Sequence, residues 1–147
     1  MNILQENTYG NVKVIQNNSY QWAVTDLLGK VIVPFGKYDW IDGFDQGLAR
    51  VKIGKEPSTK ANNSNLWGII NERGEEVLPV EYNEVWKFLG KNRHTTTVKK
   101  NGITKLIYFR DLNSPVKPQE QNQDVVEETV DENTDNIFDE DLYGLLF

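Results

Sequence analysis

Two stretches of this chain repeat one another about 45 residues apart, and this repeat constrains the fold more than any other feature. The second copy is the more complete; it spans residues 66–88 and reads LWGIINERGEEVLPVEYNEVWKF. When Trp22 is aligned with Trp67 (67 − 22 = 45), Gly29 falls on Gly74. Repeats of this length usually form supersecondary units that share a core and present a binding surface. We therefore expect packed repeat units and a binding function more than a catalytic cleft.

Three hairpins are predicted from alternating apolar residues and turn residues. Their strands are 11–15 with 20–25, 48–53 with 66–71, and 95–100 with 103–109. Asn17 and Asn18 are the expected turn of the first hairpin, since asparagine tolerates positive φ. Asn101 with Gly102 is the strongest turn signal, because both central positions of a two-residue hairpin turn need positive φ. That turn should fix the register of the third hairpin.

Two short β-branched runs, residues 31–33 and 76–78, each follow a glycine turn and stop at a proline. Because proline cannot donate to a ladder, Pro34 and Pro79 should end these strands or lie on a sheet edge. The next segments carry large aromatic residues, which we expect to fill the junctions between units. The residues expected to form this repeated core are Trp22, Tyr38, Phe44, Trp67, Tyr82 and Phe88. The predicted fold is all-β, an antiparallel array of hairpin repeats that forms a curled sheet or an open barrel-like stack.

The net charge of −6 hides an uneven distribution along the chain. Residues 118–147 carry ten acids and no Lys or Arg, which leaves 12 acids (22 − 10) and all 16 basic residues in 1–117. The body is therefore +4 (16 − 12) and the tail −10. A run rich in Gln, Asn and acids is typical of disorder. We predict a β-repeat domain at 1–114, an acidic linker at 115–136 and a separate C-terminal peptide at 137–147.

The C-terminal peptide, IFDEDLYGLLF, mixes acids with large apolar residues. Such a segment is poorly suited to water alone and is expected to become ordered when it meets a groove on a partner. The residues predicted to make that contact are Ile137, Phe138, Leu142, Tyr143, Leu145, Leu146 and Phe147. In the body, residues 55–65 form a polar loop longer than a hairpin needs, and such loops are either functional or merely tolerated.

The segment 66–88 resembles one unit of the bacterial WG-repeat family, above all in its WGIIN sequence and in Pro79. The first copy is similar, although Ala23 stands where the family has glycine. A partial third copy at 98–108 has lost its tryptophan, with Lys105 near the expected place. The resemblance covers about two to two and a half units. It implies an all-β array of hairpin units in proteins that act mainly by binding, with no shared catalytic residues.

Residues suited to catalysis are few, and we expect no enzyme activity, cofactor or metal. His94 is the only histidine, and an exposed position at a strand end explains it better than a role as a base. The carboxylates of Asp39, Asp42 and Asp45 lie in turn sequence, where solvation accounts for them. An acidic run in the tail resembles a calcium-binding loop, but Asn136 replaces the required glycine and the bidentate glutamate is missing.

A possible basic patch gathers on the predicted third hairpin. Its members are Arg93, Lys99, Lys100, Lys105 and Arg110. Clustered Lys and Arg are the first requirement for phosphate binding, but a charge of +4 over 117 residues supports nucleic-acid binding only weakly. The acidic tail also resembles in kind the Phe-terminated tails of single-stranded-DNA-binding proteins, which dock onto partner proteins.

The leading hypothesis is a non-enzymatic interaction or assembly protein, in which the β-repeat body offers one surface and the tail a second. One alternative is an immunity or inhibitor protein whose acidic tail neutralises a basic toxin, which predicts strong salt dependence. A lesser alternative is a nucleic-acid-associated factor. The chain has no cysteine, no signal-peptide pattern at its start and no run of roughly 20 apolar residues. We therefore expect a bacterial or phage protein of the cytoplasm that uses no membrane.

Overall fold

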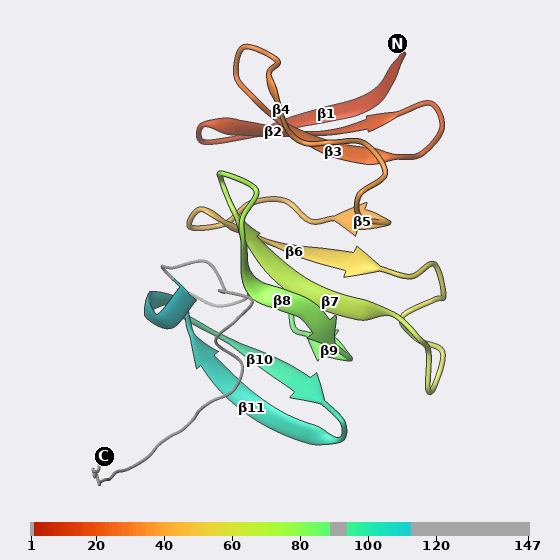
Figure 1. Cartoon of the computed structure of the whole chain (residues 1–147), viewed down its shortest axis with the longest axis vertical. Helices are drawn as coiled ribbons and strands as arrows, with labels where there is room; N and C mark the ends of the chain where they lie inside the picture. Colours follow the sequence, from red (N-terminus) through yellow and green to blue (C-terminus); the bar gives the residue numbers. More distant parts are fainter. Residues whose placement is uncertain (1, 89–93, 113–147) are drawn as a thin grey trace, which may run out of the picture. The chain divides into compact units, whose positions relative to one another are not determined.

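The computed structural model describes residues 2–88 and 94–112, which all lie within one compact unit, Met1–Val116. The predictions for the linker, the C-terminal peptide and Arg93 fall outside the described residues. Strands account for most of the described chain, and a single 3-10 turn, η1, follows the last of them (Figure 1). Their bounds are β1 Ile3–Tyr9, β2 Val12–Asn17, β3 Trp22–Asp26, β4 Val31–Val33, β5 Trp40–Ile41, β6 Leu48–Ile53, β7 Leu66–Asn71, β8 Glu76–Tyr82, β9 Glu84–Val85, β10 Thr95–Lys100, β11 Ile103–Tyr108 and η1 Phe109–Leu112.

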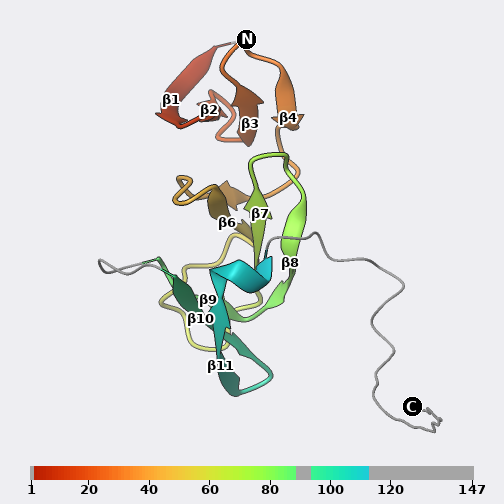
Figure 2. The ribbon, with the colours of Figure 1, turned by 90° about the vertical axis from the view of Figure 1, so that its left-hand side faces the viewer.

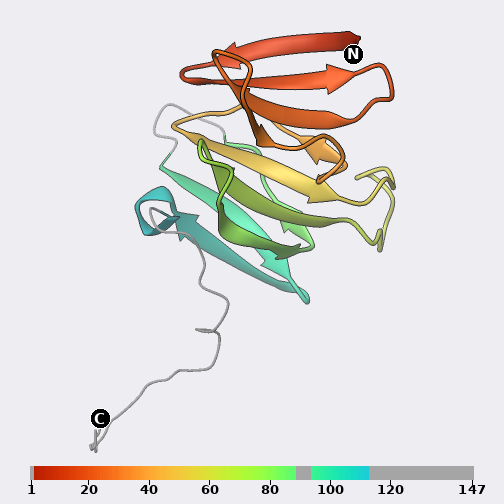
Figure 3. The ribbon, with the colours of Figure 1, turned by 45° about the horizontal axis from the view of Figure 1, so that its top comes forward.

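The strands form three antiparallel sheets. The strand orders are β1-β2-β3-β4, β5-β6-β7-β8 and β11-β10-β9. Every pairing between named strands is antiparallel and joins neighbours in the chain, as Figures 1 and 3 show. This confirms the expected all-β array of hairpins.

Each sequence repeat is divided between two sheets. The first copy gives β3 and β4 to the first sheet, and β5 and β6 to the second. The second copy gives β7 and β8 to the second sheet, and β9 and β10 to the third. Each copy therefore supplies two of the four strands of the second sheet, and neither copy completes that sheet alone. The first sheet is completed by the hairpin of β1 and β2, of which β1 has no counterpart among the predicted strands.

The same turn opens both copies. Asp26 Oδ1 accepts hydrogen bonds from the backbone N–H groups of Leu28 and Lys30, both at 2.9 Å. Asn71 Oδ1 accepts the corresponding bonds, at 2.9 Å from Arg73 and 3.0 Å from Glu75. Short side chains that bond to the backbone two residues further on favour turns. The alignment of the two copies made from the sequence is thus repeated bond for bond in the structure.

Two apolar cores lie on opposite faces of the second sheet. Its strands alternate between them, since Ala49, Val51 and Ile70 enter the first core while Leu48 and Ile69 enter the second. The first core also takes Val12, Val14, Val24, Val33, Tyr38, Ile41 and Phe44. The second also takes Val77, Leu78, Val85, Phe88, Val98, Phe109 and Leu112. A sheet buried on both faces reads as continuous apolar sequence, which is why WGIIN and LARV lack clear alternation.

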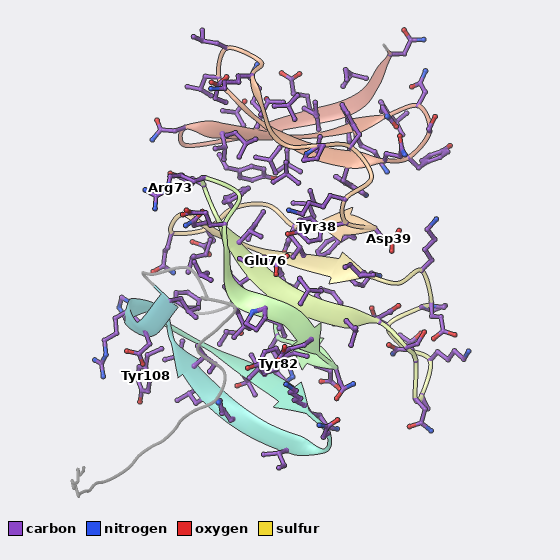
Figure 4. The ribbon with its side chains drawn as sticks, in the orientation of Figure 1. Tyr38, Asp39, Arg73, Glu76, Tyr82 and Tyr108 are labelled. Atoms are coloured by element: carbon purple, nitrogen blue, oxygen red, sulfur yellow. The ribbon has the colours of Figure 1, made fainter. Side chains whose placement is uncertain are left out.

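The aromatic residues predicted for the repeated core fall into two groups. Tyr38, Phe44 and Phe88 are buried, and the Phe88 ring meets Phe109 edge to face at 4.7 Å. Trp22, Trp67 and Tyr82 are half-buried and pack against the cores from the side. The Tyr38 hydroxyl donates to Glu76 Oε2 at 2.7 Å, and Figure 4 shows the two side chains meeting between the first two sheets. Burial, followed by this hydrogen bond, raises the pKa of Tyr38.

Proline has different consequences in the two copies. β4 ends directly before Pro34, whereas β8 runs through Pro79 on the edge of its sheet. Because β8 continues, it passes close over Gly68, where an added Cβ would lie 2.7 Å from the Leu78 oxygen and 2.9 Å from the Val80 Cα. Only glycine fits at such a close backbone approach. The early end of β4 explains why Ala23, which is fully buried, is accepted at the corresponding position.

The structure tests two predicted hairpin turns, the one after β2 and the one after β10. Asn101 (φ 52°) and Gly102 (φ 80°) form the expected two-residue turn, which confirms the predicted register of β10 and β11. In the first hairpin the positive φ (62°) falls on Tyr20, and Asn17 serves instead as an acceptor for the N–H groups of Ser19 and Gln21. The turn thus begins at Asn17 and Asn18 as predicted, but the residue with positive φ is Tyr20 and not an asparagine.

Candidate binding site

A stack of one arginine and two tryptophans closes the turn of the first copy. The Arg50 guanidinium lies 5.4 Å from the Trp40 ring centre and 5.0 Å from that of Trp67. The two indoles meet edge to face at 5.7 Å. Cations attract the faces of aromatic rings, and the attraction grows as water is removed. With its side chain 12 % exposed, Arg50 gains from this effect and fixes both rings.

The polar end of Arg50 joins the second sheet to the third. Its Nε and Nη2 each lie 3.0 Å from Asp42 Oδ2, and its Nη1 donates to the Val85 carbonyl on β9 at 2.9 Å. A planar guanidinium suits several simultaneous bonds of this kind. The prediction that solvation accounts for Asp42 is therefore wrong. The same holds for Asp39, which accepts a hydrogen bond from the Gly54 N–H at 2.7 Å. Both carboxylates have structural partners that lie too far along the chain for turn sequence to reveal.

The second copy repeats this backbone with different side chains. The Asp42 N–H donates to the Arg50 carbonyl, and the Trp86 N–H donates to the Thr97 carbonyl, both at 2.9 Å. Trp86 therefore occupies the position of Asp42, and Thr97 that of Arg50. Thr97 has no charged end to hold the side chain that stands in the Asp42 position, and Trp86 is 56 % exposed. Its indole Nε1 donates to Glu84 Oε1 at 3.1 Å.

Beside Trp86 lies a groove of about 700 Å³. Two tryptophans line it together with mostly uncharged polar residues. The lining residues are Arg50, Ser58, Asn62, Asn63, Trp67, Asn83, Glu84, Val85, Trp86, Lys99, Asn101 and Gly102. The groove thus draws on both copies, the long loop and the tip of the third hairpin. Sites that pair apolar surface with a few fixed polar groups are the usual form of binding pocket.

One wall of the groove is the long loop between β6 and β7, which internal hydrogen bonds hold in place. Glu56 accepts from the Lys60 ammonium at 2.7 Å and from the Ser64 N–H at 2.6 Å. These bonds, led by the one from Lys60, lower the pKa of Glu56 to about 2. Asn65 is buried and donates through Nδ2 to the Glu56 carbonyl at 2.8 Å. A bonded loop of this kind can hold Asn62 and Asn63 at the groove in a fixed orientation.

The third copy can now be placed residue by residue. Trp67 pairs with Lys52 across β6 and β7, and Thr104 pairs with Lys99 across β10 and β11. Thr104 therefore takes the tryptophan position, and Lys105 takes that of Gly68 one residue later. The sequence alone predicts only that Lys105 lies near the tryptophan position. Within the described residues, the third sheet thus has a threonine where the second sheet has the Trp67 ring that packs on Arg50.

The predicted basic patch is distributed over two faces of the third hairpin. Lys105 pairs with Val98, so it shares a face with Lys100, whereas Lys99 points to the opposite face. Lys100 forms an ion pair with Glu81 and lies 5.5 Å from the Tyr82 ring centre. Arg110, in η1, lies over Tyr108, whose side chain Figure 4 labels at this end of the molecule. The described members of the patch thus do not form one cluster on one face.

Other chemistry is sparse in the described part of the chain. Within residues 2–88 and 94–112, no group of three or more His, Asp or Glu side chains is placed to hold a metal ion. His94 is exposed beside β10, and its carbonyl accepts the Phe109 N–H at 2.8 Å. The same residues contain no helix of the length and apolar character that a bilayer crossing requires.

Comparison with known proteins gives one result. Two segments, residues 22–56 and 67–102, match the family model described as "WG containing repeat". No curated protein and no solved structure matches the chain. The two matched segments begin at Trp22 and Trp67, the two tryptophans on which the copies align. The chain therefore belongs to the WG-repeat family and carries two of its units.

Proposed function

We propose that this chain is a non-enzymatic protein-binding module, and that the groove beside Trp86 is where its body holds a partner protein. The exposure of Trp86 is the observation that carries this proposal. Its counterpart in the first copy is folded into an ion pair, so the backbone does not force the indole outward. Tryptophan is enriched among the residues that dominate binding energy at protein interfaces.

The surroundings of Trp86 suit a protein partner. Uncharged amides line the groove at Asn62, Asn63, Asn83 and Asn101, a chemistry that suits the amides of a partner protein. Those of Asn63 and Asn83 also bond within the chain, which holds them in place. The frame around them is fixed by the Arg50 bonds and by the Glu56 bonds. A rigid site loses less conformational entropy on binding, which favours affinity.

A photo-crosslinking experiment tests the site directly. A photoreactive phenylalanine analogue is placed at Trp86 of the full chain in its native host, and at Leu28 as the matched control. Leu28 is 95 % exposed in the turn of the first copy, far from the groove in sequence. We expect a discrete protein adduct from position 86 and none from position 28. Equal adducts from both positions, or none from either, would refute a binding role for the groove.

Once the crosslinked partner is known, its affinity can be measured against variants. Trp86→Ala should weaken binding roughly 30-fold, the loss expected for a central interface tryptophan. The same substitution should leave the free energy of unfolding within about 0.5 kcal/mol of the parent, because the side chain is mostly exposed. Tyr20→Ala, at another exposed aromatic, is the control and should change the affinity little.

The C-terminal peptide at 137–147 remains a second proposed contact, in keeping with its mixture of acids and apolar residues. Capture of partners from the native host by the full chain and by a chain ending at Ser114 tests it. Partners lost on truncation would support docking by the peptide. If binding instead falls steeply with added salt, and the partner is a basic protein, the inhibitor alternative gains support. Identical partner sets at any salt concentration would exclude both.

A further inference from the structure

β11 is the outer strand of the third sheet, and it lacks the features that protect the other edges. Edge strands are commonly blunted by short length, proline or bulges. β5 and β9 have two residues each, β4 has three and stops at Pro34, β8 contains Pro79, and β1 has a register shift between Ile3 and Gln5. β11 has six residues, no proline and an unbroken register with β10. It alone among these outer strands presents a long, regular edge.

The repeat shows what such an edge is built to accept. β11 corresponds to β7, because Thr104 pairs with Lys99 as Trp67 pairs with Lys52. The outer edge of β7 is covered by β8. No described strand takes that place beside β11, so the third sheet has three strands where the other two have four (Figure 2).

The backbone groups that point outward can be identified. The Phe109 N–H donates inward to the His94 carbonyl. Since N–H directions alternate along an antiparallel strand, the N–H groups of Ile103, Lys105 and Ile107 also point to β10. The N–H groups of Thr104 and Leu106, and likewise that of Tyr108, therefore face away from the sheet. They are donors for one additional strand.

Charge and exposed apolar surface define the kind of strand that fits. Residues 95–108 contain three lysines and no acid, and Lys105 stands exposed in the middle of β11. Lysine on an edge opposes pairing with a second copy of the same strand. Ile103 is 71 % and Leu106 52 % exposed, on opposite faces of the strand. A phosphate backbone would leave this apolar surface uncovered, and the lysines are divided between faces.

We propose that β11 binds an extended acidic peptide of a partner protein, which adds to the third sheet as its fourth strand. The main-chain donors of Thr104, Leu106 and Tyr108 hold the peptide backbone. Lys105 pairs with an acidic side chain, and apolar side chains of the peptide cover Ile103 and Leu106. Strand addition to an open edge is a recurrent mode of peptide recognition. None of these residues of β11 lines the groove beside Trp86, so the proposal does not depend on the groove.

The test uses amide-resolved NMR of the full chain with a defined probe, a capped octapeptide that alternates Glu and Val. On binding, hydrogen exchange should slow at the amides of 104, 106 and 108, while those of 103, 105 and 107 were already protected. A peptide that alternates Lys and Val should bind at least roughly tenfold more weakly, because like charges face each other across the new pair. Uniform changes at odd and even amides, or equal binding of both peptides, would overturn the proposal.

Two substitutions separate main-chain from side-chain contributions. Thr104→Pro removes one outward donor and leaves the bonds to β10 intact, so peptide affinity should fall roughly 3- to 10-fold. Thr104→Ala keeps the donor and should change affinity less than about twofold. Lys105→Glu should reverse the preference between the two peptides, and it serves as the second variant if the proline variant does not fold. If Thr104→Pro folds and binds as well as Thr104→Ala, strand addition is excluded.

Two further measurements test whether the ligand is a peptide or a nucleic acid, and whether the β11 site is independent of the groove beside Trp86. An eight-nucleotide single-stranded DNA that displaced the Glu-Val peptide and bound more tightly would make this a nucleic-acid surface and overturn the peptide proposal. Trp86→Ala should leave peptide binding unchanged. Failure of the crosslinking at position 86 would thus not affect the proposal for β11. Failure of peptide binding at β11 would likewise not affect the proposal for the groove.

Discussion

The turn that contains Trp40 and the turn that contains Trp86 have the same backbone and opposite surfaces. In the first, Arg50 joins Asp42, Trp40 and Trp67 into one closed cluster. In the second, the positions of Asp42 and Arg50 hold Trp86 and Thr97, and the indole faces solvent. The comparison shows that main-chain bonds and apolar cores preserve the repeat, which leaves the residues at its open end free to serve either stability or binding.

Of the substitutions that test this comparison, loss of Arg50 should lower the free energy of unfolding the most. Arg50→Ala removes the cation between the two rings and leaves Asp42, which is mostly covered, without its partner. Breaking such a pair typically costs about 3 kcal/mol of unfolding free energy when it is largely buried. Thr97→Ala, at the corresponding position, should cost less than about 1 kcal/mol. Urea denaturation of both variants measures the difference, and equal losses would mean that the stack contributes nothing particular to the first turn.

A second contrast lies at the residue after each repeat tryptophan. Gly68→Ala pushes a methyl group against the Leu78 carbonyl and the Val80 backbone, which should cost about 2 to 3 kcal/mol. Ala23→Gly, the reciprocal change, adds no clash and should cost about 1 kcal/mol through lost burial and a more flexible unfolded chain. Thermal unfolding followed by circular dichroism ranks the two. A harmless Gly68→Ala would show that β8 does not lie as close to β7 as described.

The equivalent tyrosines should differ at alkaline pH. Burial and the Glu76 hydrogen bond raise the pKa of Tyr38. The pKa of Tyr82 is also raised, by burial and then by Glu81, but the nearby Lys100 opposes the shift. A raised tyrosine pKa means that the stabilisation is complete below the unfolded value, near 10, and is lost as pH rises further. Tyr38→Phe should cost about 1 to 2 kcal/mol at neutral pH and should flatten this alkaline loss.

Absorbance titration supplies the measurement for the tyrosines. Tyr38 should ionise last, at the pH where the chain unfolds, and Tyr38→Phe should remove that late step. Tyr82→Phe is the control and should leave it in place. An early, reversible ionisation of Tyr38 in the folded protein would contradict the bond to Glu76.

The smallest effect is expected in the long loop. The pKa of Glu56 is lowered to about 2 from a usual value near 4.5, so the carboxylate holds the loop above that usual value and releases it as pH falls toward 2. NMR titration of the side-chain carboxyl should give a midpoint near 2. Glu56→Gln should loosen the loop at neutral pH, seen as faster amide exchange at Ser64, with little change in global stability. A midpoint near 4.5 would show that the loop is not held by this group.

Much of the fold could be predicted because it depends on local signals. The turns at Gly29 and Gly74, the Asn101–Gly102 hairpin and the two prolines each act over a few residues, and the repeat indicates the rest of the pattern. β1 was not predicted because its residues (ILQENTY) are almost all exposed and show no alternation of apolar and polar side chains. It forms a strand mainly because it pairs with the edge of β2. Tertiary pairing of this kind overrides weak local preference.

The candidate site was much harder to predict from sequence. The sequence predicts that the aromatic residues of both turns fill the junctions between units, and for Trp86 this is wrong, since the residue is 56 % exposed. Only the register shows that Trp86 aligns with Asp42 and not with Trp40, since the turn places the two tryptophans two positions apart. The pairing of Arg50 with the Val85 carbonyl spans 35 residues, a separation over which spacing carries no signal.

The division of each repeat between two sheets has a consequence for unfolding. In arrays whose repeats are self-contained, one unit can melt while its neighbour persists. Here the loss of either copy removes two of the four strands from the second sheet and uncovers both cores at once. The described body should accordingly lose its structure in a single transition, and the protein gains a cooperativity that its repetitive sequence would not suggest.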